Sequence, residues 1–259
     1  MAQTQEYNAT IVARTDVHEG LCFVQIAPDQ APFPPFEPGQ FVSVGCNMVE
    51  DGAPALVKRS YSIGSPATER RWVELFVVHV DDGEFTSWLF AQREGARIWL
   101  SPKAGGGFTL EGFTPGRDLV LVATGTGVAP FVSMYRTYRH VPPWRRIVIM
   151  NGVRRARDLG YREELEGAAR TDSRLLYLPA ATREGAEWGG LRGRVGEFLE
   201  PERWRSLVGA PLSPEECHVY LCGNPEMIES LEGVLTLRGF RKHTRHHPGN
   251  LHLEKYWTD

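Results

Sequence analysis

The segment RSYSIGSP, residues 59–66, places a cation, an aromatic ring and three serine hydroxyls at the end of an apolar run. Arginine can pair with a phosphate, a tyrosine ring offers a flat face, and serine hydroxyls form hydrogen bonds. One interpretation is therefore a strand that presents a cation, hydroxyls and an aromatic ring to a bound molecule. The alternative is a strand that only breaks into a turn at Gly64 and Pro66.

A second chemical signal is LVLVATGTGVAPF, residues 119–131, where an apolar strand runs into small residues and a proline that suits the first turn of a helix. A pyrophosphate can bind at a helix N-terminus only where no side chain blocks the backbone amides, which Gly125 and Gly127 would ensure. The pattern GTGVAP is not the GxGxxG of dinucleotide folds. A tight strand-to-helix turn of any α/β domain therefore remains the alternative.

A third signal is VYLCGNPEMI, residues 219–228, another apolar strand that ends in small and polar residues before a helix. In open α/β sheets, ligands bind outside the carboxyl ends of the strands. Residues 125–130 and 222–225 are therefore expected to frame one crevice. Cys222 either belongs to this crevice or is a small buried apolar side chain.

Arginines follow several apolar segments in the second half of the chain. They are Arg154, Arg155 and Arg157 after RIVIM, Arg183 after LLYLPAAT, and Arg192 and Arg194 in GGLRGRVG. The ribose 2′-phosphate of NADP needs bidentate cationic partners, whereas the free 2′-hydroxyl of NAD favours an acidic residue. These arginines therefore favour NADP over NAD. Arginines that are simply solvated at the surface are the alternative.

Two large aromatic residues, Tyr256 and Trp257, stand almost at the end of the chain. Aromatic rings on a fraying tail would remain exposed to water and bury no apolar surface, so we expect both rings to pack against another surface. A flat ligand and the core of the protein are the two candidate surfaces.

Two kinds of element must position these residues, and the first kind fills the chain up to about Gly112. Short segments with alternating or β-rich composition, separated by Gly, Pro and Asp, favour an antiparallel β-barrel. Strands are expected at residues 8–17, 21–27, 41–46, 73–80 and 97–102. One short helix is expected at residues 85–94, capped by Thr86 or Ser87, and its N-terminus can attract an anion. The proline-rich residues 28–38 are expected as an edge or loop.

After residues 113–116, uniformly apolar strands alternate with helices, which indicates a parallel sheet covered on both faces. Strands are expected at residues 118–125, 146–154, 174–182 and 217–224, and helices at 130–140, 161–170, near 195–201, and from 225. We therefore expect two domains, an antiparallel β-barrel at residues 1–112 and an α/β domain with a parallel sheet at residues 117–259. A length of 259 residues agrees with two domains, because single cores stop growing at about 250 residues.

Composition excludes several classes of protein. A formal net charge of −3, from 29 basic and 32 acidic residues, gives no overall field that would draw the chain to nucleic acid or to a membrane. Neither a leader segment nor an apolar span is apparent, so we expect a cytoplasmic protein, with monomer as the default state. The cysteines, Cys22, Cys46, Cys217 and Cys222, are not spaced for a disulfide scaffold or a metal site, and we expect buried thiols.

Four motifs occur in a family's order over essentially the whole chain: FEPGQFVSV, RSYS, GTGVAP and CGNPEM. They resemble the plant-type ferredoxin–NADP reductase superfamily, and in particular the bacterial ferredoxin(flavodoxin)–NADP reductases. The resemblance implies an FAD-binding barrel followed by an NADP-binding α/β domain whose C-terminal tail returns to the flavin. It also implies an enzyme that takes hydride from NADPH and passes single electrons to ferredoxin or flavodoxin.

The resemblance further implies roles for individual residues. Arg59 would meet the FAD pyrophosphate, Tyr61 would stack on the isoalloxazine ring, and Thr126 would touch both nucleotides. The other implied FAD contacts are Ser60, Ser62, Phe76, Val77, Val78, His79, Glu84, Phe85, Thr86, Tyr256 and Trp257. The implied NADP contacts are Gly125, Gly127, Arg154, Arg183 and Arg194, and the residues that align flavin and nicotinamide are Ser62, Cys222 and Glu254.

The C-terminal tail departs from some relatives, because Thr258 and Asp259 follow the two aromatic residues. By resemblance, Tyr256 covers the isoalloxazine face opposite Tyr61, and Trp257 stacks on adenine. Tyr256 would then have to move before nicotinamide reaches the flavin.

Two other functions stay open on the sequence alone. One is a reductase component for another acceptor, such as an oxygenase, ferric iron or a quinone. The other is a non-catalytic nucleotide-binding regulatory module, which the intact RSYS and GTGVAP motifs oppose. Lys58 and the basic residues 241–249 are expected to dock an acidic acceptor protein.

Overall fold

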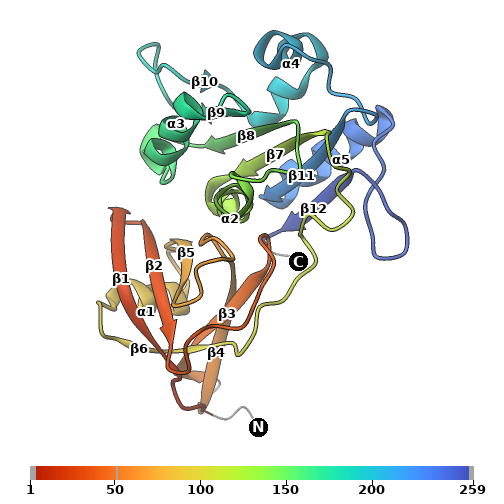
Figure 1. Cartoon of the computed structure of the whole chain (residues 1–259). Helices are drawn as coiled ribbons and strands as arrows, with labels where there is room; N and C mark the ends of the chain where they lie inside the picture. Colours follow the sequence, from red (N-terminus) through yellow and green to blue (C-terminus); the bar gives the residue numbers. More distant parts are fainter. Residues whose placement is uncertain (1–3, 51, 257–259) are drawn as a thin grey trace. The chain divides into compact units, whose positions relative to one another are not determined.

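Figure 1 shows the computed structural model, which describes residues 4–50 and 52–256. The chain divides into two compact units. The first unit comprises the residues up to Thr109 together with Val132–Thr137, and the second comprises Leu110–Phe131 and the residues from Tyr138 onward. Trp257, an expected FAD contact, lies outside the described residues.

The first unit is built on an antiparallel sheet. Its strands are β1 (Ala9–His18), β2 (Leu21–Pro28), β3 (Phe41–Glu50), β4 (Ala53–Ser62), β5 (Val73–Val78) and β6 (Arg97–Leu100). The six strands, labelled in Figure 1, pair in the order β4-β3-β6-β1-β2-β5. A bridge between Ile63, just after β4, and Leu75 of β5 joins the two ends of this order. The strands thus close on themselves, which confirms the predicted antiparallel barrel.

The barrel interior follows from the alternation of the strands. Val42 and Val44 of β3 are fully buried, and Ile11 and Val24 face them from β1 and β2 within one core cluster. The proline-rich residues 28–38 form a loop after the end of β2, as predicted, and add Phe33 and Phe36 to this core.

Helix α1 (Glu84–Ala91) begins and ends earlier than predicted, and its predicted caps are wrong. Gly83 is the N-cap and contributes no side-chain hydrogen bond. The Thr86 hydroxyl donates instead to the Gly83 carbonyl, 3.0 Å away, and accepts from the amide of Val80 at 3.1 Å. The preceding turn therefore engages this hydroxyl, because Thr86 already stands inside the first helical turn.

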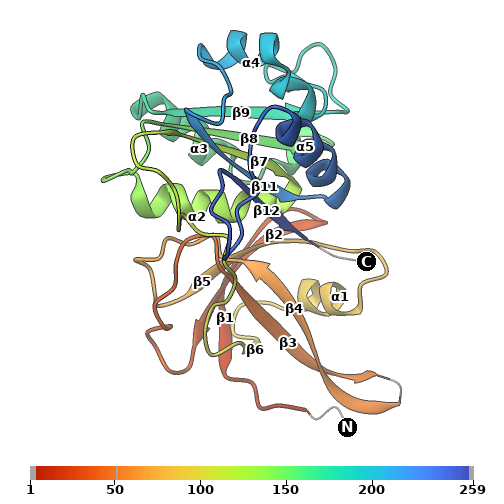
Figure 2. The same cartoon turned by 90° about the vertical axis from the view of Figure 1, so that its right-hand side faces the viewer.

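The second unit is built on a parallel sheet, as predicted. Its strands are β7 (Asp118–Thr124), β8 (Arg146–Val153), β9 (Leu175–Ala181), β10 (Leu191–Arg192), β11 (Cys217–Gly223) and β12 (Leu251–Lys255). The order is β10-β9-β8-β7-β11-β12, and Figure 2 shows β9, β8, β7, β11 and β12 one beneath the other. Because the order reverses beside β7, the crevice expected at a topological switch point lies at the carboxyl ends of β7 and β11.

The helical elements connect these strands. The α-helices are α2 (Ala129–Tyr138), α3 (Arg162–Thr171), α4 (Pro201–Val208) and α5 (Pro225–Leu237), and the 3₁₀ helices are Gly125–Val128, Ala156–Asp158 and Val195–Leu199. The single helix predicted near 195–201 is wrong, because a 3₁₀ helix ends at Leu199 and α4 starts at Pro201. Proline cannot donate a backbone hydrogen bond but suits the first position of a new helix, which Glu200 caps.

One face of the parallel sheet packs against α4 and α5. Val120, Val148 and Val219 belong to the core cluster on this face, together with Trp204 of α4 and Leu231 of α5. All four cysteines are free and buried, as predicted. Within the described part of the chain, no helix is long and apolar enough to cross a membrane.

Several histidine rings stack together in the second unit. His218 and His252 stand at positions of β11 and β12 that alternate with residues of this core. The ring of His252 lies parallel to that of Tyr220 with centroids 3.9 Å apart, and 4.4 Å from the ring of His243. His218 Nδ1 is 3.5 Å from His252 Nε2, and its Nε2 is 3.1 Å from the Thr114 hydroxyl. Among the described residues, no group of three or more His, Cys, Asp or Glu is arranged to hold a metal ion.

Both buried imidazoles of this stack resist protonation. Burial, together with the charges of Arg117 and His243, lowers the pKa of His218 to about 4. Burial, together with His243 and His218, lowers the pKa of His252 to about 3. The folded second unit therefore holds these two side chains in the neutral state over most of the acidic range.

Acid is accordingly expected to destabilise the second unit. The pKa of each histidine in the unfolded chain is near 6.5, so below that pH the unfolded state binds the additional protons. The free energy of unfolding should then fall by up to about 1.4 kcal/mol per pH unit for each histidine between pH 6.5 and 4. His252→Phe keeps a ring against Tyr220 and should roughly halve this slope, whereas the exposed control His246→Phe should not change it. Urea unfolding from pH 7 to pH 4 measures the slope, and equal slopes in all three proteins would contradict the assignment.

Candidate functional site

The RSYS motif lies at the end of β4. Tyr61 continues the inward-facing series of this strand, and its ring lies 6.3 Å from that of Phe85 in α1. Burial raises the pKa of Tyr61, so its hydroxyl remains protonated at neutral pH. Ser60 and Ser62 alternate with Tyr61 and face the other way, with the Ser60 hydroxyl 3.0 Å from that of Ser43.

Arg59 presents a cation at the surface of the first unit. Its Nη1 donates to the carbonyl of Lys58 at 2.8 Å, and the side chain is exposed. No described carboxylate forms an ion pair with it. The guanidinium is therefore available for a phosphate.

The segment from Phe76 to His79 presents only part of its side chains. Phe76 is 3% exposed and stacks on Phe23 with ring centroids 4.5 Å apart, and Val77 is fully buried. Val78 is 47% exposed, and His79 is half-buried with Nε2 3.3 Å from the Ser87 hydroxyl. A ligand on this strand can thus touch the side chains of Val78 and His79, but only the backbone of the other two.

The start of α1 offers backbone donors. Glu84, Phe85 and Thr86 form its first turn, where amide groups have no acceptor within the helix. The glycine N-cap supplies no side chain to satisfy them. Phe85 and Thr86 are buried, so this turn can bind an anion through its backbone and not through those two side chains.

The ends of β7 and β11 meet at the carboxyl edge of the parallel sheet, as predicted. Cys222 pairs with Ala123 in register, and the Thr124 hydroxyl accepts from the Asn224 amide at 2.8 Å. Sequence reasoning missed Thr124 and the role of Asn224 as the cap of α5, although asparagine before proline is a helix-start signal.

The two glycines of the GTGVAP turn have different physical roles. Gly125 has a φ of +56°, and a Cβ there would meet nothing within 4 Å. Gly127 packs tightly instead, because a Cβ would lie 2.5 Å from the carbonyl oxygen of Cys222 and 3.0 Å from the hydroxyl of Tyr256. Gly125 therefore leaves the backbone open to a ligand, and Gly127 lets the turn approach β11.

Cys222 and Glu254 lie side by side on neighbouring strands. They pair in register between β11 and β12, and the thiol Sγ donates to Glu254 Oε2 at 3.8 Å. Burial and then the Glu254 carboxylate raise the pKa of Cys222 well above its usual value. The sulfur is therefore a thiol and a hydrogen-bond donor at neutral pH, not a thiolate nucleophile.

Tyr256 follows β12 and returns to the same turn. Its amide donates to the Gly223 carbonyl at 3.2 Å, and its hydroxyl hydrogen-bonds with Thr126. The tail therefore brings the Tyr256 hydroxyl to the place where Gly127 and Cys222 meet, while the residue as a whole is 37% exposed.

The three arginines predicted to grip NADP follow adjacent strands. Arg154 and Arg183 come after β8 and β9, where the Arg183 amide donates to the Arg154 carbonyl at 2.8 Å, and Arg194 follows β10. All three side chains are exposed, and none forms an ion pair with a described residue. They lie at the same carboxyl edge as the GTGVAP turn.

Asn151 is a further polar residue at this edge that sequence reasoning missed. It is 2% exposed near the end of β8, and its Nδ2 donates to the Gly125 carbonyl at 3.4 Å. Its Oδ1 has no partner among the described protein atoms. A single asparagine in an apolar strand carries no pattern that would have revealed it.

Comparisons with known proteins agree with this arrangement. The family model of the oxidoreductase NAD-binding domain matches residues 121–232, which make up most of the second unit. The flavodoxin/ferredoxin–NADP reductase of Escherichia coli K12 is 33% identical over 232 residues, covering 88% of this chain and 90% of that protein. The ferredoxin–NADP reductase A of Sorangium cellulosum is 34% identical over 229 residues, covering 85% and 80%.

A solved structure shows the same similarity in three dimensions. The ferredoxin NADP⁺ reductase from Neisseria gonorrhoeae, determined with bound FAD and NADP, matches with a TM-score of 0.86 and 26% identity. The match covers 96% of this chain and 98% of that one. The chain belongs to the ferredoxin(flavodoxin)–NADP reductase family.

Proposed function

We propose that the protein is an FAD-dependent oxidoreductase that takes hydride from NADPH and passes electrons singly to a ferredoxin or flavodoxin. The observation that carries the proposal is the carboxyl edge of the parallel sheet. There the GTGVAP turn, the Cys222–Glu254 pair and Tyr256 come together in a chain of this family.

The first unit fits FAD. The exposed guanidinium of Arg59 and the amides at the start of α1 would hold the pyrophosphate, and the ring of Tyr61 would support the isoalloxazine. Ser62 would lie near flavin N5, and the exposed surface of Val78 and His79 would line the rest of the cofactor. Bound FAD supplies the chemistry that links a two-electron donor to a one-electron acceptor.

The second unit fits NADPH. Gly125 leaves room for the pyrophosphate, and Arg154, Arg183 and Arg194, which form no ion pair with a described residue, would take the 2′-phosphate. Burial, and after it the Glu254 carboxylate, raises the pKa of the Cys222 thiol, so both groups would align the nicotinamide and not exchange protons with it. Tyr256 would occupy the nicotinamide position until NADPH enters.

The proposal includes the electron acceptor, the oligomeric state and the cellular location of the protein. An acidic ferredoxin or flavodoxin would meet Lys58 and the exposed basic residues of the segment 241–249. We further propose a monomer in the cytoplasm that does not bind nucleic acid, because the net charge of −3 provides no general attraction to polyanions.

A visible spectrum of the purified protein followed by anaerobic titration tests the proposal. A flavin spectrum that bleaches with NADPH and much less with NADH is expected. A colourless protein that takes up no FAD would reject it in favour of a non-catalytic nucleotide-binding module. Strong bleaching without electron transfer to ferredoxin or flavodoxin would favour a reductase for another acceptor.

Removing two of the arginines should separate NADPH from NADH. In the variant Arg183→Ala/Arg194→Ala, the KM for NADPH is expected to rise about 100-fold or more, because each hydrogen bond to a charged group contributes about 1.5–3 kcal/mol and two are lost. The KM for NADH should not change, since NADH lacks the 2′-phosphate. Arg192→Ala, another exposed arginine of the same segment, is the matched control. Steady-state kinetics with both donors decide the matter, and a parallel rise in both KM values would refute the assignment.

A further inference from the structure

Helix α1 is short, and its own residues provide neither a capping side chain at the N-terminus nor a cation at the C-terminus. It has eight residues, its N-cap is Gly83, and its last turn contains no basic residue. An isolated helix of this length is marginal in water, so contacts from elsewhere must hold it in place.

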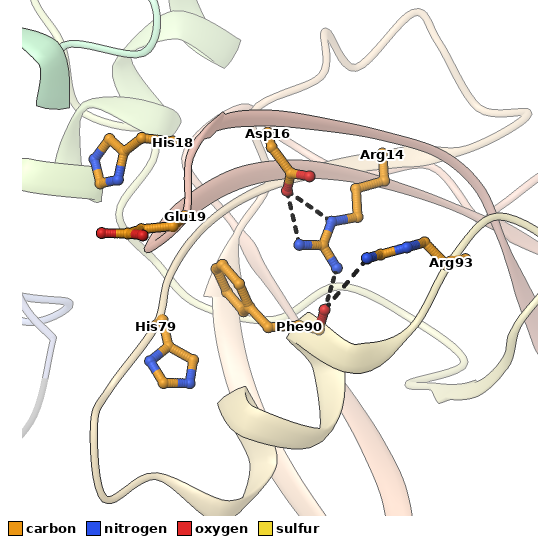
Figure 3. Close-up of a pocket in the computed structure, with 7 residues that line it drawn as sticks. All are labelled: Arg14, Asp16, His18, Glu19, His79, Phe90 and Arg93. Atoms are coloured by element: carbon orange, nitrogen blue, oxygen red, sulfur yellow. Dashed lines mark hydrogen bonds and ion pairs between the residues drawn. The ribbon is translucent and has the colours of Figure 1, made fainter.

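Arg14 of β1 supplies those contacts at the C-terminus of α1 (Figure 3). Its Nη1 donates to the carbonyl of Phe90 at 2.6 Å. The same nitrogen donates to the carbonyl of Gln92 at 2.9 Å. The guanidinium carbon lies 5.0 Å from the centre of the Phe90 ring. A cation that hydrogen-bonds the last carbonyls of a helix satisfies them and complements the negative end of the helix dipole.

Asp16 fixes this arginine from the other side. Arg14 Nε donates to Asp16 Oδ1 at 2.8 Å, and Nη2 is 2.7 Å from the same oxygen. The two residues are two positions apart on β1 and thus on the same face of the strand. The Arg14 side chain is only 9% exposed, whereas Asp16 is 52% exposed, so the shielded contacts are those of Arg14 with the end of α1 and not the ion pair itself.

Arg14 also lines an open groove of about 470 Å³, together with His79 and Arg93 (Figure 3). The groove is not a separate anion site, because all three guanidinium nitrogens of Arg14 already contact protein oxygens. His79, a proposed FAD contact, also touches α1, because its Nε2 lies 3.3 Å from the Ser87 hydroxyl of that helix.

We propose that Arg14 is a positioning residue for FAD. By holding the C-terminus of α1 on β1, it fixes the direction in which the first-turn amides of the same helix meet the pyrophosphate. The helix is about 12 Å long, so a tilt at one end displaces the other. The inference rests on the proposed function, because it needs FAD to be the molecule bound at Glu84–Thr86.

The rate of FAD release from the holoprotein tests this role without using enzyme activity. The increase in flavin fluorescence after dilution reports release. Arg14→Met should release FAD about tenfold faster. Loss of a partly buried cation at a helix C-terminus can change an equilibrium constant by up to about 30-fold. Arg93→Met is the matched control: its Nη1 also approaches the Phe90 carbonyl, at 3.5 Å, but the side chain is exposed, so less than a twofold change is expected.

Two further variants separate positioning from general stability. Ile26→Val removes a methylene group from the barrel core on β2 and lowers stability but leaves the hydrogen bonds of Arg14 to α1 in place, so FAD release should stay at the wild-type rate. Arg14→Lys keeps the charge but loses the planar fork, and should fall between wild type and Arg14→Met. It also serves if the methionine variant does not fold.

The possible results distinguish this inference from the proposed function. If the wild-type protein binds no FAD, the proposed function itself fails. If wild type binds FAD and both Arg14 variants release it at the wild-type rate, only the positioning role is overturned. An equal acceleration in Ile26→Val and Arg14→Met would likewise assign Arg14 to stability alone.

Discussion

Gly127→Ala is expected to lower the rate of flavin reduction by NADPH about 100-fold, because a misplacement of about 1 Å at a reacting centre can cost that much. A Cβ at this position would lie 2.5 Å from the Cys222 carbonyl and 3.0 Å from the Tyr256 hydroxyl. The turn, the end of β11 or the tail must therefore shift, and each of them frames the proposed nicotinamide site.

Anaerobic stopped-flow measurement of flavin bleaching checks this prediction. Gly167→Ala in α3 is the matched control, since its Cβ would meet nothing closer than Arg170 Nη2 at 3.6 Å. The control should reduce its flavin at the wild-type rate, and both variants should keep the wild-type FAD spectrum. A wild-type reduction rate in Gly127→Ala would show that this close approach does not matter for hydride transfer.

Arg136→Met is expected to lower the free energy of unfolding of the first unit by about 3–5 kcal/mol, the usual cost of breaking a buried ion pair. Arg136 belongs to the part of α2 within that unit, and its Nη1 lies 2.6 Å from Glu74 Oε1. The same nitrogen donates to the Gly64 carbonyl at 2.8 Å. The Glu74 side chain is 10% exposed, so the variant would leave a carboxylate buried without its cation.

Urea unfolding of the purified variants measures this effect. Arg139→Met replaces an exposed arginine just beyond the end of α2 and should change stability by less than about 0.5 kcal/mol. Adding Glu74→Gln to Arg136→Met should restore part of the loss, because no net charge is then left buried. A double variant less stable than Arg136→Met would contradict the ion-pair explanation.

The sequence predicted the fold well where the pattern is local. Alternation identified the barrel strands β1, β2, β3, β5 and β6, and continuous apolar runs identified β7, β8, β9 and β11. β12 was missed because LHLEK is short, mixed in polarity and at the sheet edge. The helix predicted across residues 195–201 failed because Pro201 starts a new helix, and the caps predicted for α1 failed because Gly83 already serves as the N-cap.

Residues of the candidate site were likewise predicted where the sequence pattern is local and missed where tertiary packing decides. The strand-end position of RSYS and the meeting of the GTGVAP turn with CGNP could be predicted, because carboxyl ends of parallel strands share one edge. The burial of Phe76 and Val77 could not, since the side chains that a strand hides depend on what packs against it. Asn151 and Arg14 gave no signal, because each hydrogen-bonds to a residue that is distant in sequence.

The sequence by itself determined the class of protein, the two kinds of sheet, and the residue types available for a flavin and a phosphorylated nucleotide. These properties depend on composition, on periodicity over a few residues, and on motifs in a fixed order. Only the tertiary structure decided that Gly127 serves close packing while Gly125 stays open, that Cys222 is a thiol held by Glu254, and that Arg14 closes the end of α1. These roles depend on strand pairing and burial, which join residues far apart in the chain and set the pKa and accessibility of each group.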